Sequence, residues 1–251
     1  MKRFFALFAA LTLLCTGISA QTTVCRTETN IAYRNAADDG YVDSLCRLDI
    51  CYPVDRKGFP TVVWFHGGGL TGGRREIPKA LCDKGFAVVG VDYRLAPRVK
   101  VADCVADAAA AAAWVVKNIA SYGGDPRLIF IAGHSAGGYL TSMIGLDKRW
   151  MAPYGIDPDT AFAALIPYSG QVVTHFARRR EMGIPDTQVV VDDMAPLNYI
   201  RPDCPPILIL SGDREREMLG RYEENAYFWR MMQVAGHPDV GIREFDAVSY
   251  T

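Results

Sequence analysis

The sequence predicts an α/β fold, a mostly parallel sheet with helices on both faces. The chain has 251 residues, half of them hydrophobic and 22% charged, which is the balance of an ordinary globular domain. Short apolar runs alternate with helical segments, a pattern typical of parallel strands joined by covering helices. The length suits one domain. The formal charge of −1 lacks the basic excess of nucleic-acid-binding proteins, so no nucleic-acid partner is expected.

The expected elements run β-β and then alternate between strand and helix, forming a single domain over 21–251. Two antiparallel edge strands at 30–34 and 44–52 flank a turn at 38–40. A polar, irregular insertion is expected at about 171–200. The remaining strands are predicted at 61–65, 86–91, 128–132, 162–168, 206–210 and 240–245. Helices are predicted at 77–84, 101–121, from about 138 to 146, and at 217–235.

The first twenty residues are typical of a secretory signal peptide. Lys2 and Arg3 form a short positive segment, and an apolar stretch follows at 4–14. That stretch is too short to anchor the chain across a bilayer. Small residues end at Ala20, so we expect cleavage there, export to the periplasm or outside the cell, and no stable membrane insertion.

Six cysteines remain after this cleavage. An even number of cysteines in an exported chain permits disulfides, but the sequence does not choose their pairing. Their spacing lacks the pattern of a zinc site, so no metal is expected. The oligomeric state is likewise left open. The six are Cys25, Cys46, Cys51, Cys82, Cys104 and Cys204.

Ser135 is the candidate nucleophile. It lies in Gly-His-Ser-Ala-Gly, directly between an apolar strand and a helix. This is the pattern of a nucleophile elbow, where a sharp turn exposes the serine oxygen above the sheet. Gly133 and Gly137 are needed because side chains there would clash across the turn. The positive end of the following helix also faces the serine.

A second glycine-rich segment, His66-Gly67-Gly68-Gly69, follows an earlier strand. Its glycines free the backbone to direct N–H groups at a developing oxyanion. We therefore predict an oxyanion hole formed by Gly68, Gly69 and the N–H of Ala136. His66 is expected to brace this loop rather than to act as a base.

Together these motifs resemble the α/β-hydrolase superfamily, and within it the hormone-sensitive-lipase-like and carbohydrate-esterase-like enzymes. The resemblance covers roughly residues 40–246. One residue departs from it, since Arg98 stands where the lipase-like pattern usually has an acid. The resemblance implies hydrolysis of carboxylic esters through an acyl-serine intermediate without a cofactor. The segments that carry it are His66–Gly69, Asp92–Pro97, Tyr122–Pro126, Gly133–Gly138 and Ser211–Asp213.

Asp213 is the candidate acid of the catalytic triad. It follows the apolar strand 206–210, where the chain order serine, then acid, then histidine places the acid. Its role would be to fix the histidine tautomer and stabilise the imidazolium. Glu215 and Glu217 are assigned instead to the first turn of a helix, where acids suit the helix dipole.

The same chain order calls for a histidine after the last strand, and none is found there. His237 is interpreted as a turn residue at the wrong end of the sheet, and His134 is expected to point away from the reacting centre. His175, in the insertion, could contact substrate or act as an unusual base. The closing helix that the resemblance implies is also missing, so one sheet face near the last strand should expose apolar side chains.

The favoured function is an exported serine hydrolase that cleaves esters of short or aromatic acyl groups through an acyl-enzyme at Ser135. The substrate would be a small molecule or a polysaccharide carrying acyl groups. Because the histidine is missing, a truncated esterase and a pseudoenzyme acting as a binding protein both remain open. An arylformamidase-like or peptidase-like amide hydrolase is a further alternative. The 251-residue chain is expected to be nearly inactive.

Overall fold

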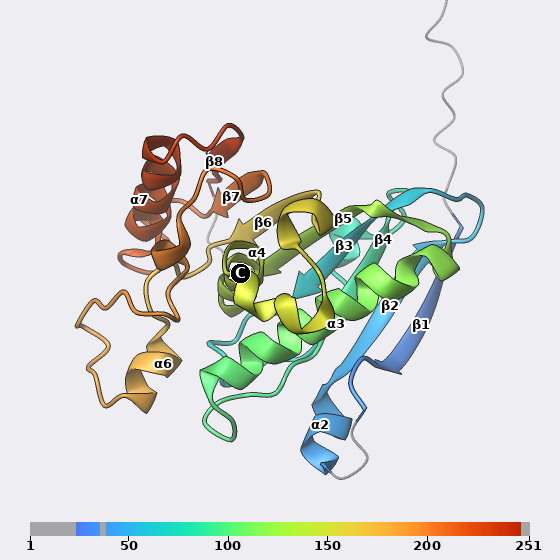
Figure 1. Cartoon of the computed structure of the whole chain (residues 1–251), viewed down its shortest axis with the longest axis horizontal. Coiled ribbons are helices and arrows are strands. Elements are labelled where there is room, and N and C mark those ends of the chain that lie inside the picture. Colours follow the sequence, from blue (N-terminus) through green and yellow to red (C-terminus); the bar gives the residue numbers. More distant parts are fainter. Residues whose placement is uncertain (1–23, 36–38, 247–251) are drawn as a thin grey trace, which may run out of the picture.

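The computed structural model describes residues 24–35 and 39–246, which form a sheet of eight strands with helices packed along it (Figure 1). The predicted signal peptide lies outside these residues. The strand order is β1-β2-β4-β3-β5-β6-β7-β8. The strands are β1 (Cys25–Ala32), β2 (Arg47–Pro53), β3 (Phe59–Phe65), β4 (Ala87–Val91), β5 (Gly124–His134), β6 (Ala164–Tyr168), β7 (Ile207–Ser211) and β8 (Val240–Glu244).

The sheet is mixed but mostly parallel, as predicted. β2 pairs antiparallel with both β1 and β4, while every pair from β4 through β3 to β8 is parallel. The carboxyl ends of the parallel strands therefore meet at one edge, where ligand sites of such sheets form. In the pairing of β3 with β5, Phe65 lies opposite Gly133, so the two glycine-rich segments leave the sheet side by side.

The longer helices lie on one face of the sheet. The crossovers through α3 (Val101–Tyr122), α4 (Ala136–Leu146) and α7 (Arg221–Val234) run in the same direction, so the right-handed rule places these helices together. Figure 1 shows α3 crossing the strands and α7 beside β7 and β8. The crossover from β3 to β4 runs in the opposite direction and covers the other face, with the 3-10 helix η1 (Lys79–Leu81) as its helical element.

Shorter elements complete the described chain. They are α2 (Gly40–Leu45), α5 (Pro158–Ala161), α6 (Phe176–Glu181), and the 3-10 helices η2 (Lys148–Trp150), η3 (Ala152–Tyr154) and η4 (Pro196–Tyr199). Within the segment 171–200 the regular elements are α6 and η4. Among the described residues no helix is long and apolar enough to cross a membrane.

Several predicted elements are wrong in extent. The strand predicted at 30–34 is β1 at Cys25–Ala32, and the strand predicted at 128–132 is β5 at Gly124–His134. The segment 77–84 holds only the three-residue η1, because Cys82 is extended and Asp83 takes a positive φ of 57°, so the helix ends there. The helix predicted from 217 begins at Arg221, after Gly220 with φ 83°. The short helix α2 occupies the start of the predicted strand 44–52, so β2 begins only at Arg47.

The sheet face near β7 and β8 exposes apolar side chains, as the sequence indicated. Leu208 is 38% exposed, whereas its neighbours Ile207 and Ile209 are buried. Leu208 lines a shallow groove with Val240 and Gly241. β8 is thus packed against α7 on one side and open on the other.

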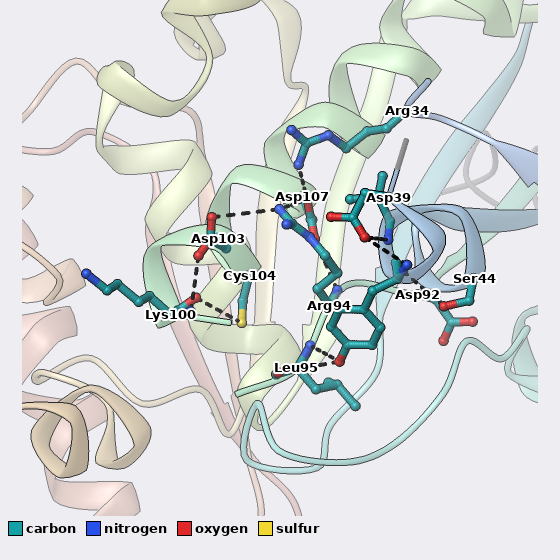
Figure 2. A network of polar contacts seen from close by, with 12 residues as sticks. Arg34, Asp39, Ser44, Asp92, Arg94, Leu95, Lys100, Asp103, Cys104 and Asp107 are labelled. Carbon is teal, nitrogen blue, oxygen red and sulfur yellow. Dashed lines mark hydrogen bonds and ion pairs between the residues drawn. The ribbon is translucent and has the colours of Figure 1, made fainter. Parts of the chain in front are cut away.

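Asp107 is a fully buried carboxylate that ties three segments together (Figure 2). It lies in α3 and accepts hydrogen bonds from the Arg94 backbone N–H at 3.1 Å and from the Arg94 guanidinium at 2.7 and 2.9 Å. Arg34, after β1, pairs with the same carboxylate. These bonds raise the pKa of Arg94 above its usual range. The ion pair thereby fixes the loop after β4 to α3.

We predict that Asp107→Ala lowers the free energy of unfolding by about 3–5 kcal/mol, because it leaves the Arg94 guanidinium without its buried partner. Urea unfolding measures the change. The matched control is Glu223→Ala, which removes an exposed pair with Arg214 and should cost about 1 kcal/mol or less. Equal losses in the two variants would contradict the role assigned to Asp107.

Candidate active site

Ser135 stands at the sharp turn between β5 and α4. Its φ of 53° and ψ of −111° are a strained conformation for a residue with a side chain. A Cβ atom added at Gly137 would lie 2.0 Å from the carbonyl oxygen of Phe65, and one added at Gly133 would lie 2.7 Å from it. Both positions therefore require glycine, as the motif predicted, and β3 packs directly against the turn.

The segment after β6 supports the same turn from the other side. The Ser135 N–H donates to the Tyr168 carbonyl at 2.7 Å, and the Tyr139 N–H donates to the Ser135 carbonyl at 3.0 Å. A Cβ atom on Gly138 would lie 2.8 Å from the Cα atom of Gly170. The backbone of Ser135 is thus held by neighbours on both sides, which maintains its strained conformation.

The glycine-rich loop after β3 passes beside Ser135. A Cβ atom added at Gly67 would lie 3.5 Å from the Ser135 Cβ atom. The carbonyl oxygen of the following residue, Gly68, accepts hydrogen bonds from the N–H groups of Thr71 and Gly72 at 3.1 and 3.0 Å. These bonds close a tight turn. Such a turn keeps the loop compact over the carboxyl end of β5.

Three backbone donors near this turn have no protein partner. Within the described part of the chain, the N–H groups of Gly68, Gly69 and Ala136 make no hydrogen bond. Ala136 is the first residue of α4, where N–H groups have no partner inside the helix. These are the three donors that the sequence assigned to an oxyanion hole, and they remain available to an anionic oxygen.

His66 braces the loop, as predicted. Its ring stacks on Tyr93 with centroids 4.3 Å apart, and the Tyr93 hydroxyl donates to the His66 carbonyl at 2.8 Å. Burial lowers the pKa of His66, so its ring is neutral near pH 7. A second brace joins the loops, since the Ala96 N–H donates to the Leu70 carbonyl at 2.8 Å.

Asp213 lies in the turn after β7, at the same edge of the sheet. Its Oδ1 atom accepts the N–H groups of Glu215 and Arg216 at 2.9 and 3.1 Å, so the carboxylate holds its own turn together. The side chain is half-buried. Its second oxygen, Oδ2, makes no hydrogen bond within the described residues. It can therefore accept a hydrogen bond from a further donor.

Sequence reasoning missed the buried carboxylate of Glu217. This residue was predicted in the first turn of a helix, but α7 begins four residues later, and Glu217 is 6% exposed. Its Oε2 atom accepts the Ser169 hydroxyl at 2.8 Å and the Gly212 N–H at 3.2 Å. The helix-breaking Gly220 was the sequence signal that could have placed Glu217 before the helix.

None of the four histidines lies beside Asp213. The Nε2 atom of His237 contacts the Cys204 carbonyl at 3.0 Å, at the amino end of β7, which agrees with the predicted turn role. His134 packs on Tyr168 with centroids 5.4 Å apart, and burial lowers its pKa. Both rings are therefore engaged in packing or turn formation.

His175 is buried beneath the insertion rather than exposed to substrate. Its Nδ1 atom accepts the Ala177 N–H at 3.1 Å, capping α6, and its ring packs on Tyr139. Burial, together with the nearby positive charge of Arg221, lowers its pKa to about 3. The sequence hypothesis of His175 as a base therefore finds no support in this geometry.

The chain matches several known esterases. The BD-FAE family model matches residues 48–164. The Mycobacterium tuberculosis protein named probable carboxylic ester hydrolase LipM is 30% identical over 205 residues, which cover 72% of this chain and 47% of that protein. A rice protein named probable isoprenylcysteine alpha-carbonyl methylesterase ICMEL1 is 40% identical over 147 residues, covering 53% of this chain and 35% of that protein. The chain thus spans about half the length of these relatives, or less.

Solved structures give a longer match. Thermogutta terrifontis esterase 2, phosphonylated by cyclosarin, has a TM-score of 0.69 and 26% identity, covering 89% of this chain and 84% of that one. The fold and the elbow define an α/β hydrolase. The chain belongs to this superfamily, and its residues 48–164 are similar to the BD-FAE family.

We predict that His175 makes the protein less stable in acid. The pKa of its ring is about 6.5 when unfolded and about 3 when folded, so the unfolded chain binds the extra proton between these values. The free energy of unfolding therefore falls as the pH drops from 6.5 towards 3. His175 contributes about 1.4 kcal/mol of this fall for each pH unit. His175→Asn keeps a capping acceptor and should remove that share of the slope. An unchanged slope in urea unfolding at pH 4 to 6 would contradict the assignment.

Proposed function

We propose that the chain is a carboxylic ester hydrolase in which the Ser135 hydroxyl attacks the ester carbonyl. The observation that carries this proposal is the strained serine beside three unpartnered backbone N–H groups. The N–H groups of Gly68, Gly69 and Ala136 would stabilise the negative oxygen that forms on attack. Collapse of that intermediate expels the alcohol and leaves the acyl group on Ser135, and water then releases the acid.

Asp213 is proposed as the acid that orients the catalytic base. Its Oδ1 atom is held by two backbone N–H groups, which would fix the carboxylate, and Oδ2 could accept the N–H of an imidazole. None of the four histidines of this sequence is proposed as the base, because none of them lies beside Asp213. Without a base, the remaining contribution to catalysis is that of the oxyanion hole and substrate binding.

A second candidate function follows from that observation. A protein with an oxyanion hole and no base would bind esters or carboxylates without turning them over. The complete elbow and the open N–H donors favour hydrolysis, since binding alone does not require a strained serine. The placement of the four histidines favours binding.

The substrate and location are also proposals. Short or aromatic acyl esters, including acyl groups on polysaccharide, agree with an exported protein, and the N-terminal pattern of Lys2, Arg3 and the apolar stretch supports export. Several of the similar proteins are named as esterases or ester hydrolases, which supports an ester as the substrate. An exported enzyme would meet its substrate outside the cytoplasm.

We predict that the chain hydrolyses p-nitrophenyl acetate slowly and that Ser135→Ala reduces the rate to that of buffer. The substitution removes only the hydroxyl group that would attack the ester. Release of p-nitrophenol, followed by absorbance, measures the rate. The control Ser121→Ala changes an exposed serine at the far end of α3 and should leave the rate unchanged. A Ser135→Ala rate equal to that of the original chain would refute the mechanism.

We further predict that added imidazole accelerates the part of the rate that depends on Ser135. Neutral imidazole can accept the serine proton in place of the missing histidine, so the acceleration should grow as the pH rises through the titration of imidazole. Subtracting the rate of Ser135→Ala removes direct catalysis by imidazole. If the difference does not respond to imidazole, the missing group is not a general base.

A further inference from the structure

The strand register places Cys25 and Cys51 on the same face of the sheet. Cys51 of β2 lies opposite Thr27 of β1, and Cys25 stands two residues before Thr27, so the three side chains point the same way. Tyr52, the next residue of β2, points to the other face, where its ring packs on Tyr122 of α3 with centroids 5.1 Å apart. The two cysteines therefore face away from α3.

The crossover from β3 to β4 covers the face on which these cysteines lie. Asp49 and Cys51 share a face of β2, and Gly90 of β4 lies opposite Asp49. A Cβ atom added at Gly90 would lie 2.2 Å from the carbonyl oxygen of Glu76, so the backbone of the crossover rests directly on this face. The crossover then returns to the start of β4, where Val88 lies opposite Cys51.

Cys82 brings a third thiol to this place from the crossover. It directly follows η1, and its backbone is extended. Its side chain is close enough to that of Cys51 for a hydrogen bond between the two thiols. The side chain of Cys25 contacts Asp83, the neighbour of Cys82. A thiol of the crossover thus meets a thiol of the sheet beneath it.

Geometry selects one pair among the three thiols. Cys25 and Cys51 are diagonal neighbours on two antiparallel strands, and the Cα atoms of such neighbours are about 7–8 Å apart. A disulfide needs Cα atoms within about 7 Å, so these two strands would have to move to join Cys25 to Cys51. Cys82 instead lies over the strand and already contacts Cys51.

We propose that Cys51 and Cys82 form a disulfide that fastens the crossover from β3 to β4 onto the sheet. The only regular element of this crossover is the three-residue η1, so a covalent bond supplies a hold that its secondary structure does not. The closed loop contains β3 and the glycine-rich segment His66–Gly69. The proposal does not depend on the chemistry of Ser135.

The oxidant for this step is a small disulfide such as oxidised glutathione. Cys82 is partly exposed and Cys51 is buried, so Cys82 reacts first. Its thiolate attacks one sulfur of oxidised glutathione, which breaks the S–S bond and releases one glutathione thiolate. The Cys51 thiolate then attacks the Cys82 sulfur of the mixed disulfide and releases the second glutathione. The two cysteines lose two electrons and two protons, and both go to the two glutathione molecules.

Peptide mapping of the full chain tests the pairing. The folded protein is equilibrated in a buffer of oxidised and reduced glutathione, free thiols are alkylated in denaturant, and the tryptic peptides are analysed without reduction. Trypsin places Cys51 and Cys82 on separate peptides, 48–56 and 80–84. We expect these two peptides to be joined in about nine-tenths of the chains. The remaining cysteines of the described chain should be alkylated: Cys25, Cys46, Cys104 and Cys204.

Thermal unfolding gives a second readout that does not depend on mapping. The Tm of the original chain should be about 5–10 °C higher in the oxidised form than after reduction, because the disulfide restricts the unfolded chain. Cys82→Ser, at a partly exposed position, should lose both the cross-link and this difference. The matched control Cys25→Ser removes the neighbouring thiol and should keep both. The Tm of each reduced variant shows that it folds.

Three results would overturn the proposal. In the first, Cys51 and Cys82 are both alkylated after equilibration. In the second, Cys25 is joined to either of them, which would assign the wrong pair. In the third, Cys82 carries glutathione and no cross-link forms, which would show that Cys51 cannot reach the mixed disulfide. None of these outcomes bears on hydrolysis by Ser135.

Discussion

The close contact between the carbonyl of Phe65 and the glycines around Ser135 is the constraint on which the site depends. With Phe65 opposite Gly133 in the sheet, and Gly137 at a distance that only glycine allows, β3 and the elbow cannot separate without exposing both. This contact keeps Ser135 in its strained conformation. It also brings Gly67 alongside Ser135.

Other interactions keep the donors in place. The Asp107 ion pair fixes Arg94, and the loop that follows Arg94 supports the glycine-rich segment through the hydrogen bond from Ala96 to Leu70. On the opposite side, buried Arg221 donates to the Ser169 carbonyl at 2.6 Å, next to Tyr168, which accepts the Ser135 N–H. The site is thus enclosed by polar contacts that come from α3 on one side and α7 on the other.

Much of this arrangement is predictable from local sequence. Runs such as 61–65 and 206–210 predicted strands because a sheet covered on both faces requires continuous apolar residues. The Gly-x-Ser-x-Gly pattern predicted the elbow because the steric conflict at Gly133 and Gly137 is local to the turn. Glycines after a strand led us to predict oxyanion donors at Gly68 and Gly69, and among the described residues their N–H groups make no hydrogen bond.

What the sequence did not predict depends on tertiary contacts. Glu217 accepts a hydrogen bond from Ser169, which lies 48 residues away after β6, and no spacing rule reports such a contact. The predicted helix at 77–84 ends after one short turn, because Cys82 is extended and Asp83 takes a positive φ of 57°, which the apolar pattern does not report. His175 was predicted as a substrate contact or unusual base in a polar insertion, but its ring is buried against Tyr139, where protonation is unfavourable.

The central claim is that Ser135 is the nucleophile of the proposed hydrolase. The most direct measurement is peptide mapping by mass spectrometry after exposure of the intact chain to paraoxon, which phosphorylates the Thermogutta terrifontis esterase. The account predicts one diethylphosphoryl group on Ser135, and none on exposed serines such as Ser44 or Ser121. Modification spread over several serines, or an unmodified Ser135 when other serines have reacted, would contradict it.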